Sequence, residues 1–321
     1  MKLKSLFFSV AFVMAVTACQ KDETKVIQET NQLSPMEAYV NLKSATVGRK
    51  VTSEFLDKIN VSLKAKCEDY RVMMAEYYTV SGSDEAGQTV YAHNTGNKQL
   101  GADFVPNDLR REWDGTNPNE ITFAIDQTGD AVPPFGGLAA DQTDAAIERA
   151  FMTWKNVNCS ELGLVRNGDE GLDIGIVAFI NELGGSPYVF ADIQNAGWRD
   201  INFDAGILGV TFTFIFVDGE VPTDVDNNGK LDVAFREIYY DPSWNWADNG
   251  ISNIDVESVA VHEIGHGLSQ AHFGKVSENK KGEFMTSPRA VMNAFYASPF
   301  RELTGTDIAG HCSIWDMWPI K

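Results

Sequence analysis

The chain has 321 residues, enough for one large domain or two modest ones. Hydrophobic residues make up 44% of it and aromatic residues 11%, as in a globular protein with a packed core. The formal net charge of −19, with no basic stretch to offset it, argues against nucleic acid as a partner, because phosphate binding needs clustered Lys and Arg. The acidity fits an exported protein and is compatible with calcium sites.

Residues 1–18 have the features of a targeting segment: two lysines near the start and an apolar run from Leu6 to Val16. The run is too short to be comfortable as a permanent membrane span. It ends in Val-Thr-Ala-Cys, which resembles a bacterial lipobox, in which Cys19 receives lipid and becomes the new N-terminus. A plain cleaved signal with an incidental cysteine is the alternative.

Residues 19–35 are polar and are expected to form a tether. The Gln-Lys-Asp-Glu that follows Cys19 is similar to a short acidic tag with which some Gram-negative bacteria move lipoproteins to the outer cell surface. We therefore expect a monomeric protein of the cell envelope that is anchored to the outer membrane by lipid on Cys19 and is exposed at the surface.

Residues 36–115 are expected to form a separate N-terminal region of unknown role, and a function as a pro-segment stays open. Apolar residues at helical spacing predict a helix at its start. These residues are Met36, Tyr39, Val40, Leu42, Val51, Phe55, Ile59 and Leu63. The turn-rich residues 113–118 predict a boundary, with a second domain over 118–321.

From Ile121 onward, strand and helix patterns follow in mixed order, which predicts an α+β domain. Alternating or continuous apolar residues predict four strands. The predicted strands cover residues 121–125, 174–180, 207–217 and 237–240.

Three helices are predicted in the same domain. Asp141 or Thr143 can cap the first, whose apolar face is formed by Ile147, Ala150, Phe151 and Trp154. Asp255 can cap the second. Thr304 and Asp307 can form a capping box for the last, which carries Ile308, Cys312 and Trp315 inward.

The second of these helices contains the strongest motif, His-Glu-Ile-Gly-His-Gly-Leu-Ser-Gln-Ala-His. On a helix, His262 and His266 lie on one face, so that both imidazoles can bind one metal ion. Glu263 can reach the water that the metal activates without binding the metal itself. The helix can then end, and the turned chain brings His272 back as a third ligand. Three neutral nitrogens with an open fourth position are typical of a catalytic zinc site.

This motif and its lead-in resemble the active-site helix of the metzincin zinc metalloproteases, specifically of their matrixin (matrix metalloproteinase-like) branch. Residues 290–296 resemble the Met-turn of that family, which would place Met292 as a hydrophobic floor beneath the zinc. Residues 303–310 are similar to the start of the family's last helix, and residues 121–154 to its first strand and helix. The resemblance covers about residues 118–321.

The resemblance implies a zincin-like fold, in which a twisted mixed sheet accompanies the active-site helix, the Met-turn and the C-terminal helix. It also implies a zinc-dependent endopeptidase that hydrolyses internal peptide bonds of proteins outside the cytoplasm, with Glu263 as general base. Residues 237–240 match the position of the family's edge strand, which would pair with an extended substrate. Residues 288–300 would form the wall of the pocket for the substrate side chain just beyond the cut.

The chain departs from the family pattern at Ser269, where the family has a glycine at a sharp turn. A non-glycine residue with positive φ costs roughly 1 kcal/mol, so we still expect His272 to bind. The alternative function is a surface lipoprotein that binds zinc but uses the fold for binding rather than turnover; the intact Glu263 argues against it. The Met-turn argues against a zinc hydrolase that acts on other bonds.

Residues 224–232 have the D-x-D-x-N-G-x-x-D spacing of a calcium loop. The candidate ligands are Asp224, Asp226, Asn228, Lys230 and Asp232. Phe235 stands where the usual last ligand would be, and Glu237, Asp218 or Glu220 are candidates to replace it. The resembled family carries structural ions in this segment, which supports calcium; a solvated acidic turn is the alternative.

Three cysteines remain after Cys19, and an odd number leaves one thiol unpaired. If the first and last helices of the domain lie close together, as the resemblance suggests, Cys159 and Cys312 would form a disulfide. Cys67 would then be the free thiol. Some family members stay latent because a pro-segment cysteine binds the zinc. The residues around Cys67 do not match that switch motif, so an unrelated cysteine is the other interpretation.

Overall fold

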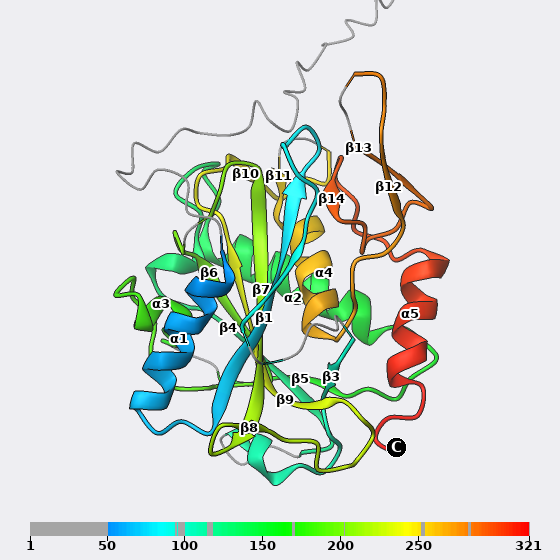
Figure 1. The fold of residues 1–321 in the computed structure, drawn as a ribbon. Helices are drawn as coiled ribbons and strands as arrows, with labels where there is room; N and C mark the ends of the chain where they lie inside the picture. Colours follow the sequence, from blue (N-terminus) through cyan, green and yellow to red (C-terminus); the bar gives the residue numbers. More distant parts are fainter. Residues whose placement is uncertain are drawn as a thin grey trace, which may run out of the picture. The chain divides into compact units, whose positions relative to one another are not determined.

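In the part of the chain that the structure describes, a mixed sheet of ten strands forms the centre of the fold, with helices on both faces (Figure 1). The structure is a computed structural model that describes residues 51–320 apart from 94, 96–99, 114–117, 169–170, 202, 252–253 and 282–283. The targeting segment (1–18), Cys19 and the tether (19–35) lie outside the described residues.

The strands of the main sheet are β1 (Tyr70–Val80), β2 (Thr89–Tyr91), β3 (Ala102–Asp103), β4 (Ile121–Ile125), β5 (Leu164–Arg166), β6 (Ile193–Trp198), β7 (Ile207–Asp218), β8 (Val221–Pro222), β9 (Leu231–Tyr240) and β14 (Phe295–Tyr296). Two smaller pairs combine β10 (Trp246–Ala247) with β11 (Ile254–Asp255), and β12 (Lys275–Glu278) with β13 (Phe284–Ser287). The helices are α1 (Ser53–Ala65), α2 (Ala140–Lys155), α3 (Ile176–Ile180), α4 (Val256–Gly267), α5 (Gly305–Trp315) and the 3-10 turns Leu109–Arg111 and Gly129–Ala131.

Seven strands follow one another across the sheet in the order β14-β1-β7-β9-β6-β4-β5. The four strands β5, β4, β6 and β9 are parallel. β7 is antiparallel to β9, and β1 is antiparallel to β7. The prediction of an α+β fold is therefore confirmed, with parallel and antiparallel strands in one sheet. β7 corresponds to the continuous apolar run 207–217 and is buried along nearly its whole length, as such a run predicts.

The two faces of the sheet carry separate hydrophobic cores. On one face, α2 and α4 pack together, and the predicted apolar side of α2 is buried. On the other face lie α1 and α3. Helix α1 contributes Leu56, Ile59 and Leu63 to that second core.

Several local predictions are wrong. Residues 176–180 form helix α3 instead of a strand, because the buried carboxylate of Glu237 accepts hydrogen bonds from the N–H groups of Ile176 and Val177 at its N-terminus. Helix α2 begins after Ala139 rather than at Asp141 or Thr143. On α5, Ile308 is 39% exposed and does not point inward.

The predicted edge strand 237–240 is also wrong. Residues 237–240 are the end of β9, which pairs with β7 on one side and with β6 on the other. Both sets of backbone groups of β9 are therefore used within the sheet, and β9 has no free edge there for a peptide.

The predicted separation of residues 36–115 from residues 118–321 does not hold for the described residues, which belong to one unit on both sides of this boundary. Strand β1 lies inside the sheet, between β7 and β14. Helix α1 covers one face beside it. Pairing between distant segments has therefore overridden the turn-rich sequence that predicted a boundary.

Cys159, just after α2, and Cys312, on α5, are joined by a disulfide with a Cα–Cα distance of 5.7 Å. This bond connects the C-terminal helix to the end of α2. Cys67 is a free, exposed thiol.

Arg199, just after β6, is the centre of a buried ion-pair cluster. Its Nη2 lies 3.0 Å from Asp126 Oδ2 and 2.6 Å from Asp173 Oδ1, and its Nη1 lies 3.1 Å from Asp130 Oδ2. The side chains of Arg199 and Asp126 are fully buried. One guanidinium thus holds the segment after β4 and the segment before α3 against the sheet.

We expect Arg199→Met to lower the free energy of unfolding by about 3–5 kcal/mol, because it leaves Asp126 buried without its cation. Arg166→Met is the matched control, since its partners Asp144 and Glu148 are partly exposed, and it should cost about 1 kcal/mol or less. Urea unfolding of both variants measures the difference. Equal losses would contradict the assigned role of Arg199.

Candidate metal centre

Helix α4 carries the first two histidines and Glu263. Asp255 caps it as predicted, its side chain accepting a hydrogen bond from the backbone N–H of Ser258 at 3.0 Å. Every residue from Val256 to Gly267 is buried, and the helix contacts β1, β7 and β9. A fully enclosed helix holds its side chains in fixed positions, which a metal site requires.

The Nε2 atoms of the three histidines converge on one point. Nε2 of His266 lies 3.1 Å from that of His262 and 3.2 Å from that of His272. Nitrogens that bind one tetrahedral zinc ion at about 2.0–2.1 Å lie roughly 3.3 Å apart. The three histidines therefore match the geometry of a zinc site.

Backbone carbonyls fix the protonation of two of the rings. Nδ1 of His262 donates to the carbonyl of Val291 and Nδ1 of His266 donates to that of Gln270, both at 2.8 Å. Each Nε2 then presents a lone pair to the other, and two lone pairs this close repel each other unless a cation lies between them. Burial lowers the pKa of His266 to about 4 and the pKa values of His262 and His272 well below 6.5. The rings are therefore neutral, as zinc ligands must be.

Ser269 allows the chain to turn so that His272 returns to the site. Its φ is 67°, in the left-handed region that usually requires glycine. Arg236 compensates in part, because its Nη1 donates to Ser269 Oγ at 2.8 Å and to the carbonyl of Gly267 at 3.0 Å. The departure from glycine is thus accommodated without loss of the third imidazole.

Glu263 has one oxygen held and one oxygen free. Oε2 accepts a hydrogen bond from the hydroxyl of Thr211 at 2.6 Å, while Oε1 is buried without a hydrogen-bond partner among the described residues. Gly209 makes room for this carboxylate, since a Cβ there would lie 2.7 Å from Oε1. Burial raises the pKa of Glu263 well above 4.5, and the nearby Glu76 adds to this. A cation at the histidines would favour the ionised form again.

The loop around Met292 packs against helix α4, which carries the first two histidines. A Cβ on Gly265 would lie 2.3 Å from Met292 Sδ, so only glycine at this position lets the methionine approach α4 so closely. Asp307 of α5 accepts hydrogen bonds from the N–H groups of Val291 and Met292, at 3.0 and 3.1 Å. Asp307 also forms the predicted capping box with Thr304. The start of α5 therefore positions the Val291 carbonyl, which in turn orients the first histidine.

The acidic loop 224–232 brings together some of its predicted ligands. Carboxylate oxygens of Asp224, Asp226 and Asp232 lie close enough to share one ion. However, Asp232 already accepts hydrogen bonds from Arg110 at 2.8 Å and from Thr223 at 2.6 Å. The side chain of Lys230 pairs with Asp103 at 3.2 Å. Protein cations thus neutralise part of this loop, and calcium stays a prediction.

Two further residues, Glu237 as a calcium ligand and Cys67 as a zinc ligand, do not lie where these roles require. Glu237, considered as a last calcium ligand, is buried, and its carboxylate accepts hydrogen bonds from the N–H groups of Ile176 and Val177 instead. Cys67 precedes β1, and the distance along this strand from Tyr70 to Tyr78 is about 26 Å at about 3.3 Å per residue. Cys67 therefore does not reach the histidines in this structure.

Residues 70–80 received no role from the sequence, yet β1 contributes directly to the surroundings of the site. The Tyr78 ring stacks on that of His262, with centroids 3.6 Å apart and an angle of 8° between the planes. Glu76 Oε2 lies 3.4 Å from His266 Nδ1. The only signal in the sequence was the apolar, β-branched and aromatic composition of this run, which is typical of a buried strand.

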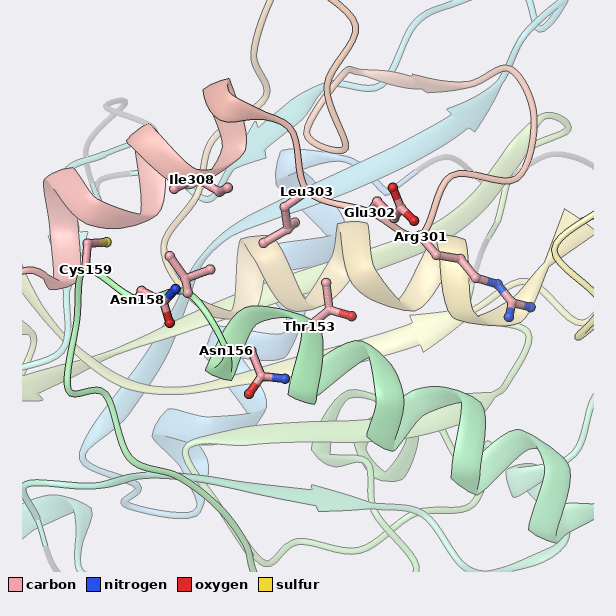
Figure 2. Close-up of a pocket in the computed structure, with 9 residues that line it drawn as sticks. Thr153, Asn156, Asn158, Cys159, Arg301, Glu302, Leu303 and Ile308 are labelled. Atoms are coloured by element: carbon pink, nitrogen blue, oxygen red, sulfur yellow. The ribbon is translucent and has the colours of Figure 1, made fainter.

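A separate hollow of about 590 Å³ lies between the end of α2 and the start of α5 (Figure 2). Figure 2 shows Thr153, on α2, pointing toward Leu303, on the segment before α5. Arg301 at its rim is already paired with Asp248, Asp255 and Glu257. His262, His266 and His272 do not line this hollow, so it is separate from the candidate metal centre.

Neither a scan against protein-family models nor a search of curated proteins found a match for this chain. Within the described ranges, no helix has the length and apolar character needed to cross a lipid bilayer.

We expect His272→Ala to weaken zinc binding by about 100-fold or more, because a direct ligand matters at least as much as the groups that orient one. His93→Ala is the control, since His93 is an exposed histidine paired with Asp57 and should keep wild-type zinc content. Metal analysis after dialysis against graded chelator concentrations gives both values. Full occupancy in His272→Ala would show that the third ligand is misassigned.

For the loop 224–232, removal of calcium with a calcium-specific chelator should lower the melting temperature. When the free concentration of an ion that binds only the folded state is about 100 times its Kd, binding raises the free energy of unfolding by about 2.7 kcal/mol. Asp226→Ala should remove the difference between the two melting curves. Identical curves for the wild type with and without chelator would favour the solvated turn.

Proposed function

We propose that the chain is a zinc-dependent endopeptidase of the metzincin type, in the matrixin branch, which hydrolyses internal peptide bonds of proteins outside the cytoplasm. The observation that carries the proposal is the convergence of three neutral imidazole nitrogens beside a carboxylate with one free oxygen. The loop of Met292 beneath α4 and its attachment to α5 through Asp307 are further support, because they agree with the Met-turn and last helix of that family.

Zinc bound by the three histidines would polarise the scissile carbonyl and lower the pKa of the attacking water to about 7. Glu263 Oε1 is the atom that would accept a proton from the attacking water and pass it to the leaving amine. Thr211 holds Oε2, so that the free oxygen keeps one direction through both transfers. The carbonyls of Val291 and Gln270 keep the protons of their histidines on Nδ1, which leaves Nε2 unprotonated.

The second candidate is a surface lipoprotein that binds zinc with the same fold but does not turn over a substrate. One observation favours it: His262, His266 and Glu263 are fully buried in this structure, so a peptide has no access to them. The carboxylate with a free oxygen favours the enzyme, because a binding protein needs no general base.

The place of action is proposed from the sequence. Lipid on Cys19 would anchor the chain to the outer membrane, and the polar tether 19–35 would separate the catalytic centre from the bilayer. Proteins and peptides at the cell surface would then be the substrates, and nucleic acid would not be a partner.

We expect Glu263→Ala to keep its zinc and to lose cleavage of casein or gelatin by about 10²–10⁴-fold, the usual contribution of a general base. Glu302→Ala is the control, because Glu302 is an exposed carboxylate outside the site and should leave turnover unchanged. Rates are measured with and without a zinc chelator. If Glu263→Ala keeps more than about a tenth of wild-type turnover, its role as the base is wrong.

A further inference from the structure

Strand β1 lies where an extended peptide would have to bind. Strand β7 supplies the two residues that surround the Glu263 carboxylate: the Thr211 hydroxyl binds it, and the missing side chain of Gly209 makes room for it. Extended peptides commonly bind a sheet by adding a strand to it. A peptide whose carbonyl reached the three histidines would therefore pair with β7 at residues 209–211. In this structure those positions pair with residues 76–78 of β1.

The backbone of β1 also passes close to the histidines themselves. Tyr78 stacks on His262, and the Tyr77 carbonyl oxygen lies near His272. A Cβ placed on Gly87, in the turn before β2, would lie 2.3 Å from Tyr77 O and 3.1 Å from His272 Cε1. The peptide bond between residues 77 and 78 thus runs past the rings of the first and third histidines.

The side chain of Tyr78 lies beside a pocket. Only 7% of Tyr78 is exposed, and it forms part of the wall of a cavity of about 230 Å³. The other walls come from residues 284–300 and include Met285, Ala290, Phe295 and Phe300. Strand β14, within the same segment, pairs in parallel with Thr79 and Val80 and so closes the other side of β1. A mostly apolar pocket of this size suits an aromatic or large aliphatic side chain.

We propose that the β1–β2 hairpin is an inhibitory segment that fills the peptide-binding groove of the catalytic centre, with the Tyr78 ring on His262 and against the side-chain pocket. This inference rests on the proposed endopeptidase function, because it describes how that site is closed. Displacement of β1 exposes His262, His266 and Glu263 and leaves β7 with a free edge for substrate. The substrates are extended polypeptides that place an aromatic or large aliphatic residue in this pocket after Tyr78 has moved away.

Two variants of the full chain should release the hairpin by different means. Tyr78→Ala removes the ring that stacks on His262 and borders the pocket. Gly87→Ala keeps every ring but introduces a Cβ that would lie 2.3 Å from Tyr77 O and 2.6 Å from Ala294 O, both backbone atoms. The matched controls are Tyr78→Phe, which keeps the ring on His262, and Gly305→Ala, whose added Cβ meets no atom within 4 Å.

The first readout does not depend on turnover. Each protein is loaded with Co²⁺, and its visible absorption is followed while a short tyrosine-containing peptide with a terminal hydroxamate is added. The hydroxamate changes the spectrum only where it reaches the metal. We expect both release variants to bind the peptide at least about tenfold more tightly than the wild type, because the closed state no longer competes as strongly. Both controls should match the wild type.

The second readout is casein cleavage by the zinc-loaded proteins, which should rise in the same two variants and disappear when Glu263→Ala is added. Tighter hydroxamate binding without any cleavage would uphold the inhibitory hairpin and refute the endopeptidase function. Equal hydroxamate affinity in the wild type and the release variants would overturn the inhibitory hairpin, whatever the turnover. Loss of folded structure in both release variants would also overturn it, because β1 would then be an obligatory strand of the fold.

Discussion

The tightest constraint on this fold is the convergence of three imidazole nitrogens, in which Nε2 of His266 lies within 3.2 Å of Nε2 of both His262 and His272. Two of them must present lone pairs, because the Val291 and Gln270 carbonyls take the protons on the other ring nitrogens. Neutral rings in this arrangement suit a cation, because it would relieve the repulsion between their lone pairs. Much of the surrounding structure keeps this arrangement in place: Asp307 holds the Val291 carbonyl, and Arg236 supports the left-handed turn at Ser269.

The pairing of β1 with β7 has a second consequence, which concerns the edge of the sheet. If β1 were absent, β7 would present unpaired backbone groups along a long and largely apolar strand, and such an edge promotes aggregation. Pairing with β1 covers this edge, and the same strand places the ring of Tyr78 on that of His262. Strand β1 therefore takes part both in the stability of the sheet, through its pairing with β7, and in the covering of His262, through Tyr78.

Buried charge is distributed in a way that suits a chain with a net charge of −19. Fully buried arginines are placed where acidic side chains or backbone carbonyls gather. Arg199 joins three carboxylates, Arg111 pairs with Asp192 at 2.9 Å, and Arg236 binds carbonyl and hydroxyl oxygens behind the third histidine. Each of these guanidiniums connects segments far apart in the sequence, and a planar group with five donors can do this better than a lysine.

Much of the site could be predicted from the sequence, because its parts are local. The spacing of His262 and His266, the Asp255 cap and the capping box of Thr304 with Asp307 depend on residues within a few positions of one another. The strand of residues 207–217 was predictable for the same reason, since a continuous apolar run specifies its own burial.

Features that depend on contacts between residues far apart in the sequence could be seen only in the tertiary structure. Residues 176–180 are helical because a carboxylate from β9 binds their N–H groups, and no local pattern encodes that contact. Strand β1 entered the sheet through pairing with β7, more than a hundred residues away, and only this pairing placed Tyr78 on His262. Periodicity in a sequence reports which face of an element is buried; it does not report which other element covers that face.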